Sequence, residues 1–308
     1  MCPVVFDRSH KIRIGRCELL RILDYYQPST LEEALVCLGR SSGSTKLLAG
    51  GTDLIIKIRE RSVEAEYIVD LVNVNELKGI VCDGDKLIIG SMVTFAELEL
   101  NPLIREYTLI LAEAAGTVGS PQIRNTATIG GNIANAAAAA DSLPPLLALE
   151  ARVRVQKAGG LREVPIEEIL IGVNKTCLLP EEILTDIVIP IPQVNTEMAF
   201  VKLGRRKALA IARLNLGLAM NMAGDGKMVK VALALGAVGV SAYRVPQVEE
   251  LLQGKYLIKD TISDACNLIS RVVADKLGSR PTAPYKKSIA GAALHKALED
   301  IKQRQGGC

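Results

Sequence analysis

The chain of 308 residues is 49% hydrophobic and 23% charged, a balance typical of a folded globular protein. Its formal net charge of +3 and aromatic content of 3% give no basis for a nucleic-acid-binding surface, which needs clustered positive charge or stacking rings. The first residues do not resemble a signal peptide. The longest weakly polar run, 133–149, is interrupted by Asp141 and two prolines, so we expect a cytoplasmic protein without membrane insertion.

Residues 23–79 are predicted to form a small layered subdomain in which strands and helices alternate. Ser29 or Thr30, followed by two glutamates, has the pattern of a capping box and predicts a helix. The remaining predicted elements are a strand at 46–50, a helix or extended segment at 54–60, and a strand at 66–71.

The next part of the chain, 80–195, mixes both kinds of element. A strand near 86–90 precedes Thr94 and Glu97, which form a second capping box before a helix. The apolar pattern of 101–119 predicts one amphipathic helix. The later elements are a helix with Pro144 and Pro145 in its first turn, a hairpin at 152–166, and a strand at 182–192 that is ended by prolines.

The last part of the chain, 196–308, is predicted to begin with strands and to become helical from about 247 to 300. The Pro- and Gln-containing segment at 190–197 is the expected boundary between two domains. The domain prediction is an N-terminal arm of unknown role at 1–22, a domain at 23–195 with subdomains at about 23–79 and 80–195, and a C-terminal domain at 196–308.

The seven cysteines are scattered, and none lies within four residues of another. The chain therefore lacks a CxxC motif and any local pattern for zinc or an iron–sulfur cluster, and no metal site is predicted. A site assembled from distant cysteines stays open. The cysteines are Cys2, Cys17, Cys37, Cys82, Cys177, Cys266 and Cys308.

Two glycine-rich segments follow apolar runs: "AGGTDL" at 49–54 and "TATIGGNIAN" at 126–135. A pyrophosphate needs several backbone N–H donors that converge without side chains in the way, and glycine provides this access. A single pair of glycines after a strand is more often an ordinary turn. Two such pairs, each beside Thr and Asn or Asp, indicate two backbone sites for one anionic cofactor.

Neither segment is a known phosphate-binding fingerprint, because the chain has no GxGxxG and no Gly-Lys-Ser/Thr. Asp141, nine residues after Asn132, is equally suited to bind a cofactor hydroxyl or to cap the helix that follows. The alanine run 136–140 taken alone indicates helical propensity, and the alternative is a lining of small side chains for a flat ligand.

Several stretches resemble one family. They include "KLLAGGTDLIIKIRE", "GSPQIRNTATIGGNIANAAAAADSLPPLLALEA", "LLPEEILTDIVIPIP" and "FVKLGRRKALAIARLN", with further similarity in "VALALGAVGVSAYRV" and "GSRPTAPYKKSIAGAAL". Together they resemble the FAD-binding (medium) subunit of the molybdenum hydroxylases, a group that includes xanthine, nicotinate and carbon monoxide dehydrogenases. The resemblance covers nearly all of 23–300.

The resemblance implies an α+β fold: a two-subdomain FAD-binding fold of the vanillyl-alcohol-oxidase (PCMH) type, followed by a small α/β C-terminal domain. FAD would be non-covalent, because no histidine falls in either glycine segment. The cofactor-binding residues that it implies are Leu48, Ala49, Gly50, Gly51, Thr52, Asp53 and Leu54 around the pyrophosphate, Val118 and Gly119 beside the flavin, Thr128, Gly131 and Asn132 in the second segment, Asp141 on a cofactor hydroxyl, Leu184 at the adenine end, and Lys202 beside the isoalloxazine.

The implied function is that of a cytoplasmic electron-transfer subunit, an oxidoreductase component with no catalytic residue of its own apart from the flavin. Partner subunits would carry 2Fe-2S clusters and molybdopterin, and NAD(P) or another molecule would accept the electrons. Val173 stands where an aromatic residue meets nicotinamide in xanthine dehydrogenase, which leaves the acceptor open. The alternatives are a stand-alone flavin-dependent oxidoreductase and a non-catalytic, nucleotide-binding scaffold subunit.

Overall fold

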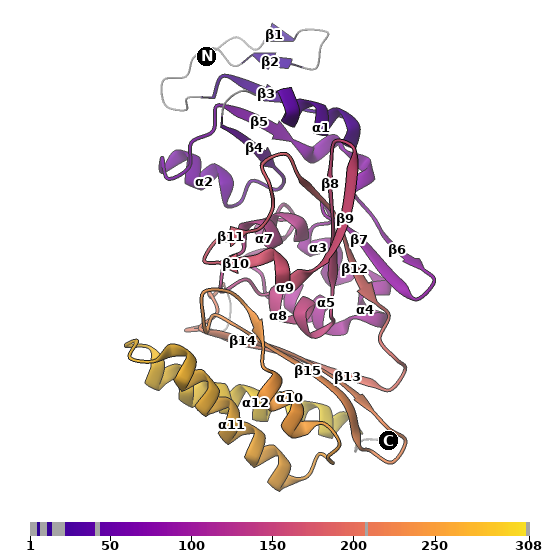
Figure 1. The fold of residues 1–308 in the computed structure, drawn as a ribbon, viewed down its shortest axis with the longest axis vertical. Coiled ribbons are helices and arrows are strands. Elements are labelled where there is room, and N and C mark those ends of the chain that lie inside the picture. Colours follow the sequence, from indigo (N-terminus) through magenta and orange to yellow (C-terminus); the bar gives the residue numbers. More distant parts are fainter. Residues whose placement is uncertain (1–4, 7–10, 14–21, 41–43, 207–208, 306–308) are drawn as a thin grey trace.

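The computed structural model describes residues 5–6, 11–13, 22–40, 44–206 and 209–305. The predicted arm at 1–22 therefore lies largely outside the described residues. Figure 1 shows an elongated molecule in which three sheet-containing layers follow one another along the long axis in chain order. The N-terminal sheet lies at one end, and the last helices lie at the other.

The first layer is a five-stranded sheet of order β1–β2–β3–β5–β4, in which β3, β5 and β4 are parallel. Its helix α2 resolves the open prediction for 54–60 in favour of a helix. Residues of α1 and β5, among them Ala34 and Val69, share a small buried core. The elements are β1 (Val5–Phe6), β2 (Lys11–Arg13), β3 (Asp24–Tyr26), α1 (Leu31–Arg40), β4 (Thr45–Leu48), α2 (Leu54–Arg59) and β5 (Tyr67–Asp70), then the 3₁₀ helices η1 (Leu71–Asn73) and η2 (Asn75–Leu77).

The middle layer is an antiparallel sheet of order β6–β7–β12–β8–β9 with short helices packed on it. The predicted hairpin forms β8 and β9, and the Thr94–Glu97 capping box is present at α3, so both predictions are confirmed. The strands of this sheet are β6 (Ile80–Asp83), β7 (Lys86–Gly90), β8 (Arg152–Lys157), β9 (Gly160–Pro165) and β12 (Ile183–Pro190), while β10 (Leu170–Gly172) and β11 (Lys175–Thr176) form a separate two-stranded sheet. The helices are α3 (Phe95–Leu100), α4 (Pro102–Tyr107), α5 (Leu109–Gly116), α6 (Pro121–Arg124), α7 (Ile129–Asn135), α8 (Leu143–Ala148) and α9 (Ile166–Ile169).

The prediction of one amphipathic helix over 101–119 is wrong. The structure has two helices, α4 and α5, and Thr108 leaves helical geometry between them with φ −139° and ψ 50°. Helix α5 buries Ile110, Leu111 and three alanines on several of its faces. A helix that is enclosed by the core needs apolar residues all round, so the apolar pattern of this stretch did not mark a solvent-facing stripe.

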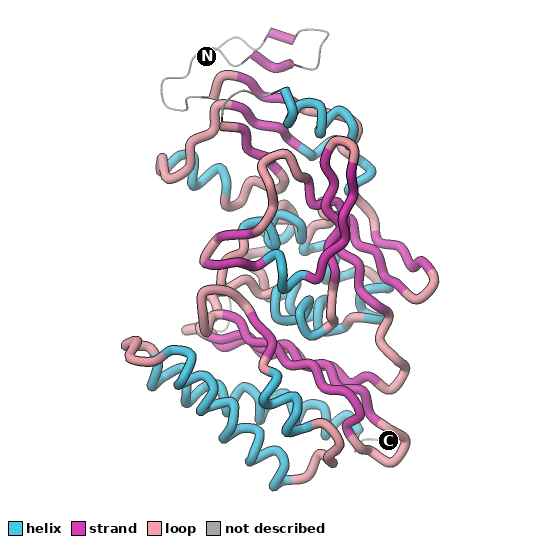
Figure 2. Tube along the Cα trace, viewed as in Figure 1, coloured by secondary structure: helices cyan, strands magenta, loops and turns pink. Residues whose placement is uncertain are grey.

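The last layer is an antiparallel sheet, β13–β14–β15–β16, whose outer face is covered by helices (Figures 1 and 2). Leu214, Leu216 and Leu218 of β14 pack in the core formed with these helices. On the other face of β14, a side chain at Gly217 would come within 2.7 Å of the backbone of Pro144 in α8, so the sheet lies directly against that helix. The elements are β13 (Thr196–Leu203), β14 (Leu214–Met222), β15 (Met228–Gly236), β16 (Tyr243–Arg244), α10 (Pro246–Leu252), α11 (Lys259–Leu277) and α12 (Ala283–Gln305).

Strands β12 and β13 belong to different sheets, and residues 191–195 connect them. Among the described residues, no helix is both long enough and apolar enough to span a bilayer.

Candidate functional site

The two glycine segments lie against each other. A Cβ atom on Gly50 would overlap the carbonyl oxygen of Thr126 and come within 2.9 Å of the Cα atom of Ala127. A Cβ atom on Gly131 would lie 3.6 Å from the Cβ atom of Ala49. The first layer thus supplies one side of the site and the start of α7 supplies the other.

The glycines serve different purposes, which corrects the expectation that all of them clear space for an anion. Gly50 is required by the approach of Thr126, and Gly130 is required because a Cβ there would lie 2.5 Å from that of Ser91. Both glycines therefore allow chain segments to pack closely. Of the four, only Gly51 has a left-handed conformation, with φ +69°.

The backbone N–H groups of the two segments also differ. In the described part of the chain, the N–H groups of Gly50, Gly51, Thr52 and Asp53 have no hydrogen-bond partner. In the second segment, by contrast, the N–H groups are already bonded within the protein. Gly130 donates to Ser91, while Gly131 and Asn132 donate to Thr128.

The prediction of two backbone sites is thus wrong for the second segment. Thr128 is the N-cap of α7, and its side-chain oxygen accepts from the N–H of Gly131. What this segment offers to a ligand is side chains. The Asn132 Oδ1 atom accepts a hydrogen bond of 2.6 Å from the Ser142 hydroxyl, which leaves the Nδ2 donors of Asn132 available.

A cavity of about 360 Å³ lies between the segments. Lys46 and Lys57 also line it, and the Lys57 ammonium donates to Asn135 Oδ1 at 2.5 Å, which joins α2 to α7. Sequence reasoning missed Lys57; its position one helical turn after a glycine segment is the signal that could have identified it. The predicted residues that line this cavity are Ala49, Gly50, Gly51, Thr52, Asp53, Leu54, Thr128, Gly131 and Asn132.

A second, larger cavity of about 940 Å³ lies where the loop after α5 meets the end of β13. The predicted residues Gly119 and Lys202 line it. Its other cationic residues are Arg124, Arg205 and Arg206, and no carboxylate residue is among the described residues that line it. Arg124 is ion-paired with Glu99, whereas Arg205 has no carboxylate partner among the described residues, so the cavity retains positive charge that an anionic group could meet.

Lys202 is fixed within this cavity by a buried ion pair. Its ammonium donates to Asp141 Oδ2 at 2.6 Å and to the carbonyl oxygen of Thr117 at 2.9 Å. The two charged side chains are only 12% and 9% exposed. Burial raises the pKa of Asp141, and this shift is opposed by the charge and hydrogen bond of Lys202 and by a hydrogen bond from Asn215.

This geometry excludes three simpler interpretations: Lys202 as a solvated surface lysine, Asp141 as a helix cap and the alanine run as a helix. Lys202 is not a solvated surface lysine. Asp141 is not the helix cap either, because Ser142 is the N-cap of α8 and neither oxygen of Asp141 bonds to that helix. The alanine run is not helical: α7 ends at Asn135, and Ala136 is left-handed with φ 46°.

A continuous set of contacts joins the two cavities. Asn132 faces the first cavity and is bonded to Ser142, whose neighbour in the chain is Asp141. Asp141 holds Lys202, which lines the second cavity together with Thr117. The two cavities are thus linked by a chain of side-chain hydrogen bonds and one peptide step.

Four predicted residues line neither cavity: Leu48, Val118, Asp141 and Leu184. Asp141 lies behind Lys202 as its ion-pair partner. Leu48 ends β4, Val118 packs against the central core, and Leu184 is buried within β12. Val173 is 55% exposed at the turn between β10 and β11. The next residue, Asn174, donates its N–H to the carbonyl of Ala136, so this turn lies against the end of α7.

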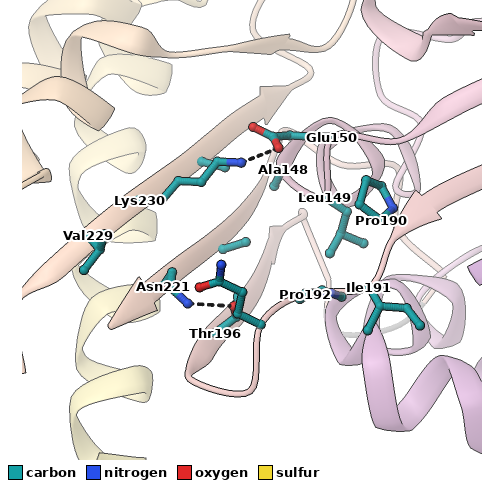
Figure 3. Close-up of a pocket in the computed structure, with 13 residues that line it drawn as sticks. Ala148, Leu149, Glu150, Pro190, Ile191, Pro192, Thr196, Asn221, Val229 and Lys230 are labelled. Atoms are coloured by element: carbon teal, nitrogen blue, oxygen red, sulfur yellow. Dashed lines mark hydrogen bonds and ion pairs between the residues drawn. The ribbon is translucent and has the colours of Figure 1, made fainter. Parts of the chain in front are cut away.

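A third cavity, of about 370 Å³, lies between the end of α8, the connector 191–195 and strands β14 and β15 (Figure 3). Lys230 pairs with Glu150 at its edge, and Asn221 contacts Thr196. None of the predicted residues lines it. The predicted residues therefore give no reason to include this third cavity in the candidate site.

The family model for the FAD binding domain in molybdopterin dehydrogenase matches residues 20–192, more than half of the chain. The chain belongs to this family. A second model, for the CO dehydrogenase flavoprotein C-terminal domain, matches residues 199–301. The predicted family, its FAD cofactor and its oxidoreductase class are thereby confirmed.

Relatives of known type resemble the chain over nearly its full length. The nicotinate dehydrogenase FAD-subunit of Eubacterium barkeri is 32% identical over 94% of this chain and 99% of that protein. A putative xanthine dehydrogenase FAD-binding subunit of Escherichia coli is 31% identical over 92% and 97%. The carbon monoxide dehydrogenase structure from Hydrogenophaga pseudoflava matches with a TM-score of 0.85 and 29% identity, over 91% of this chain and 97% of that one. The predicted fold, an FAD-binding domain followed by a C-terminal domain with mixed helix and sheet, is confirmed.

Proposed function

We propose that this chain is the FAD-carrying electron-transfer subunit of a multi-subunit molybdenum hydroxylase. It would take electrons from iron–sulfur clusters on a partner and pass them to NAD(P) or another acceptor. The observation that carries the proposal is the pair of cavities linked by hydrogen bonds, one with unpaired N–H groups and Lys57, the other with the buried Lys202. The same proposal divides the chain into domains at 23–195 and 196–308.

The first cavity fits a pyrophosphate. Gly50, Gly51, Thr52 and Asp53 would donate their N–H groups, and Lys57 would balance the negative charge. From the other side, Thr128 and Asn132 would donate through side chains while Gly131 keeps the approach open. Ala49 and Leu54 would complete the apolar wall. Contact of Leu48 with the pyrophosphate and of Leu184 with the adenine end stays a prediction, since neither residue lines this cavity.

The second cavity fits the flavin end of the cofactor. FAD, when bound, supplies the redox chemistry, and the surrounding protein groups set its reduction potential. Lys202 would place a fixed positive charge beside the isoalloxazine, with Val118 and Gly119 along the ring. Both oxygens of Asp141 already accept hydrogen bonds, but a carboxylate can accept about four, so a cofactor hydroxyl remains compatible with it.

Substrate hydroxylation would take place on a partner that carries molybdopterin, with a small iron–sulfur subunit between the two cofactors. The isolated chain should release FAD on heating and should copurify with both partners. Turnover of a small organic donor by the chain alone would favour the stand-alone oxidoreductase, and nucleotide binding without flavin reduction would favour the scaffold. Mixing the reduced chain with NAD⁺ and, separately, with ferredoxin would identify the acceptor, since Val173 offers no ring to stack on nicotinamide.

Replacing Lys57 with glutamine should weaken FAD binding about tenfold, because a hydrogen bond to a charged group contributes about 1.5–3 kcal/mol. The affinity of the variant should also depend less on salt concentration, because one charge contact is lost. Titration of the cofactor-free chain with FAD at two ionic strengths measures both effects.

Arg59→Gln is the matched control, because Arg59 is basic, exposed and on the same helix but does not line the cavity. Its FAD affinity should equal that of the unmodified chain. Equal affinities for the Lys57 and Arg59 variants would refute the phosphate role of Lys57.

A further inference from the structure

Asn215 is a fully buried polar residue beside the Asp141–Lys202 pair. It lies on β14 directly opposite Lys202 of β13. Its side chain is inaccessible to solvent, and its Nδ2 group donates to Asp141 Oδ1 at 2.9 Å and to the carbonyl oxygen of Ala140 at 3.1 Å.

The other end of this amide has no partner. Asn215 Oδ1 is a buried acceptor without a hydrogen bond in the described structure. Turning the amide over would place this oxygen against the Asp141 carboxylate, so the observed orientation is the one that electrostatics allows. A buried acceptor without a partner destabilises a fold, so packing alone does not account for asparagine here.

The neighbouring strand accommodates this amide. Gly236 of β15 pairs with Asn215, and a Cβ atom at Gly236 would overlap Asn215 Oδ1. The absence of a side chain at Gly236 leaves the space that the amide occupies. Asn215 and Gly236 are therefore paired across β14 and β15, next to the Asp141–Lys202 ion pair.

The two oxygens of Asp141 are divided between two partners. Oδ2 accepts from Lys202 and Oδ1 accepts from Asn215. With both oxygens bound, the carboxylate has one orientation, and Lys202 is held between it and Thr117. Two of the three ammonium donors are used in this way, which leaves one for the cavity.

We propose that Asn215 is a positioning residue for the flavin: it holds the Asp141 carboxylate in the orientation that fixes the Lys202 ammonium at the second cavity. This inference rests on the proposed function. A fixed cation stabilises the anionic reduced flavin, so a less ordered Lys202 lowers the reduction potential.

The first test is Asn215→Leu in the complete FAD-loaded chain, with the midpoint potential as the readout. Leucine has nearly the same shape but cannot donate to Asp141. We expect reduced FAD to lose about tenfold in binding relative to oxidised FAD, equivalent to a potential about 30 mV lower. Asn221→Leu is the control, since Asn221 lies on the same face of β14 and contacts Thr196, and its potential should not change.

The second test asks whether Asn215 acts through Asp141. In an Asp141→Asn background, adding Asn215→Leu should produce no further shift, because the orientation that Asn215 controls is already lost. An unchanged potential in the Asn215 single variant, or an equal shift in both backgrounds, would overturn the proposal. Asn215→Ser is used in the same way if the leucine variant does not fold.

The third test needs no cofactor. Carboxyl ¹³C NMR of the cofactor-free chain follows the titration of Asp141, whose pKa should rise further in Asn215→Leu because a hydrogen bond to its charged form is lost. Absence of FAD from the unmodified chain refutes the proposed function but leaves this titration valid. If the unmodified chain binds FAD but Asn215→Leu changes neither the reduction potential nor the pKa of Asp141, the role of Asn215 is refuted and the proposed function is not.

Discussion

Gly50→Ala should abolish FAD binding and reduce the free energy of unfolding by about 3 kcal/mol, at the upper end of the range for overpacked sites. The added methyl group would overlap the carbonyl oxygen of Thr126 and approach that carbonyl carbon to 2.6 Å. These are backbone atoms, so relief requires the two glycine segments to separate. Separation would remove the N–H groups of the first segment from the cavity. Urea unfolding and the flavin content of the purified chain measure the two effects.

Gly39→Ala is the matched control for this substitution. Gly39 lies in helix α1 with no atom close to the added methyl group, and alanine should stabilise the helix by about 0.5–1 kcal/mol. Full flavin content in the Gly50 variant would show that the segments do not need their close contact to hold the cofactor.

Lys202→Met should keep the fold but lower the potential of bound FAD by at least about 30 mV, a tenfold loss of reduced relative to oxidised cofactor. The methionine side chain fills similar space without the charge. Removing one partner of a buried ion pair costs about 3–5 kcal/mol when the other stays ionised. Protonation of Asp141 limits this loss, so we expect about 3 kcal/mol near neutral pH.

The pH dependence of this variant has a defined sign. Burial already raises the pKa of Asp141 in the folded chain, and Lys202 is the main opposing influence. Without Lys202 the folded pKa rises further above the unfolded value. The folded state then binds more protons, so the stability is fully present below the unfolded pKa of about 4 and is lost as pH rises through the folded pKa.

Lys227→Met, at an exposed lysine beside the β14–β15 turn, is the control and should leave both the potential and the pH profile unchanged. The prediction for Lys202 fails if unfolding of its variant shows no greater loss of stability between pH 4 and pH 8 than the control does. It also fails if the potential is unaltered.

Much of the candidate site could be predicted because the residues concerned lie in short, contiguous stretches of the sequence. Each glycine segment is contiguous, and a cap residue such as Thr128 reveals its helix within three positions. The pairing of those segments could also be inferred. What could not be inferred is which N–H groups stay unpaired, because that depends on Ser91, which is distant in the chain from Gly130.

The burial and ion pairing of Lys202 could not be predicted from its neighbours in the sequence, because its partners are also distant in the chain. Its partner Asp141 is 61 positions away, and Asn215 joins them from another strand. Nothing in "FVKLGRR" distinguishes a buried lysine from a solvated one. The single helix predicted over 101–119 failed for a related reason: burial on several faces is a property of the assembled core.

The ion pair between Asp141 and Lys202 limits how the two halves of such a chain can be exchanged by recombination during evolution. The aspartate belongs to the first half of the molecule and the lysine to the second, with the connector 191–195 between them. A recombination event at that connector would exchange one member of the pair without the other. Chimaeras of related subunits joined there should retain the reduction potential of the bound flavin only if both parents carry the carboxylate and the ammonium at matching positions. The two halves are therefore expected to be inherited together.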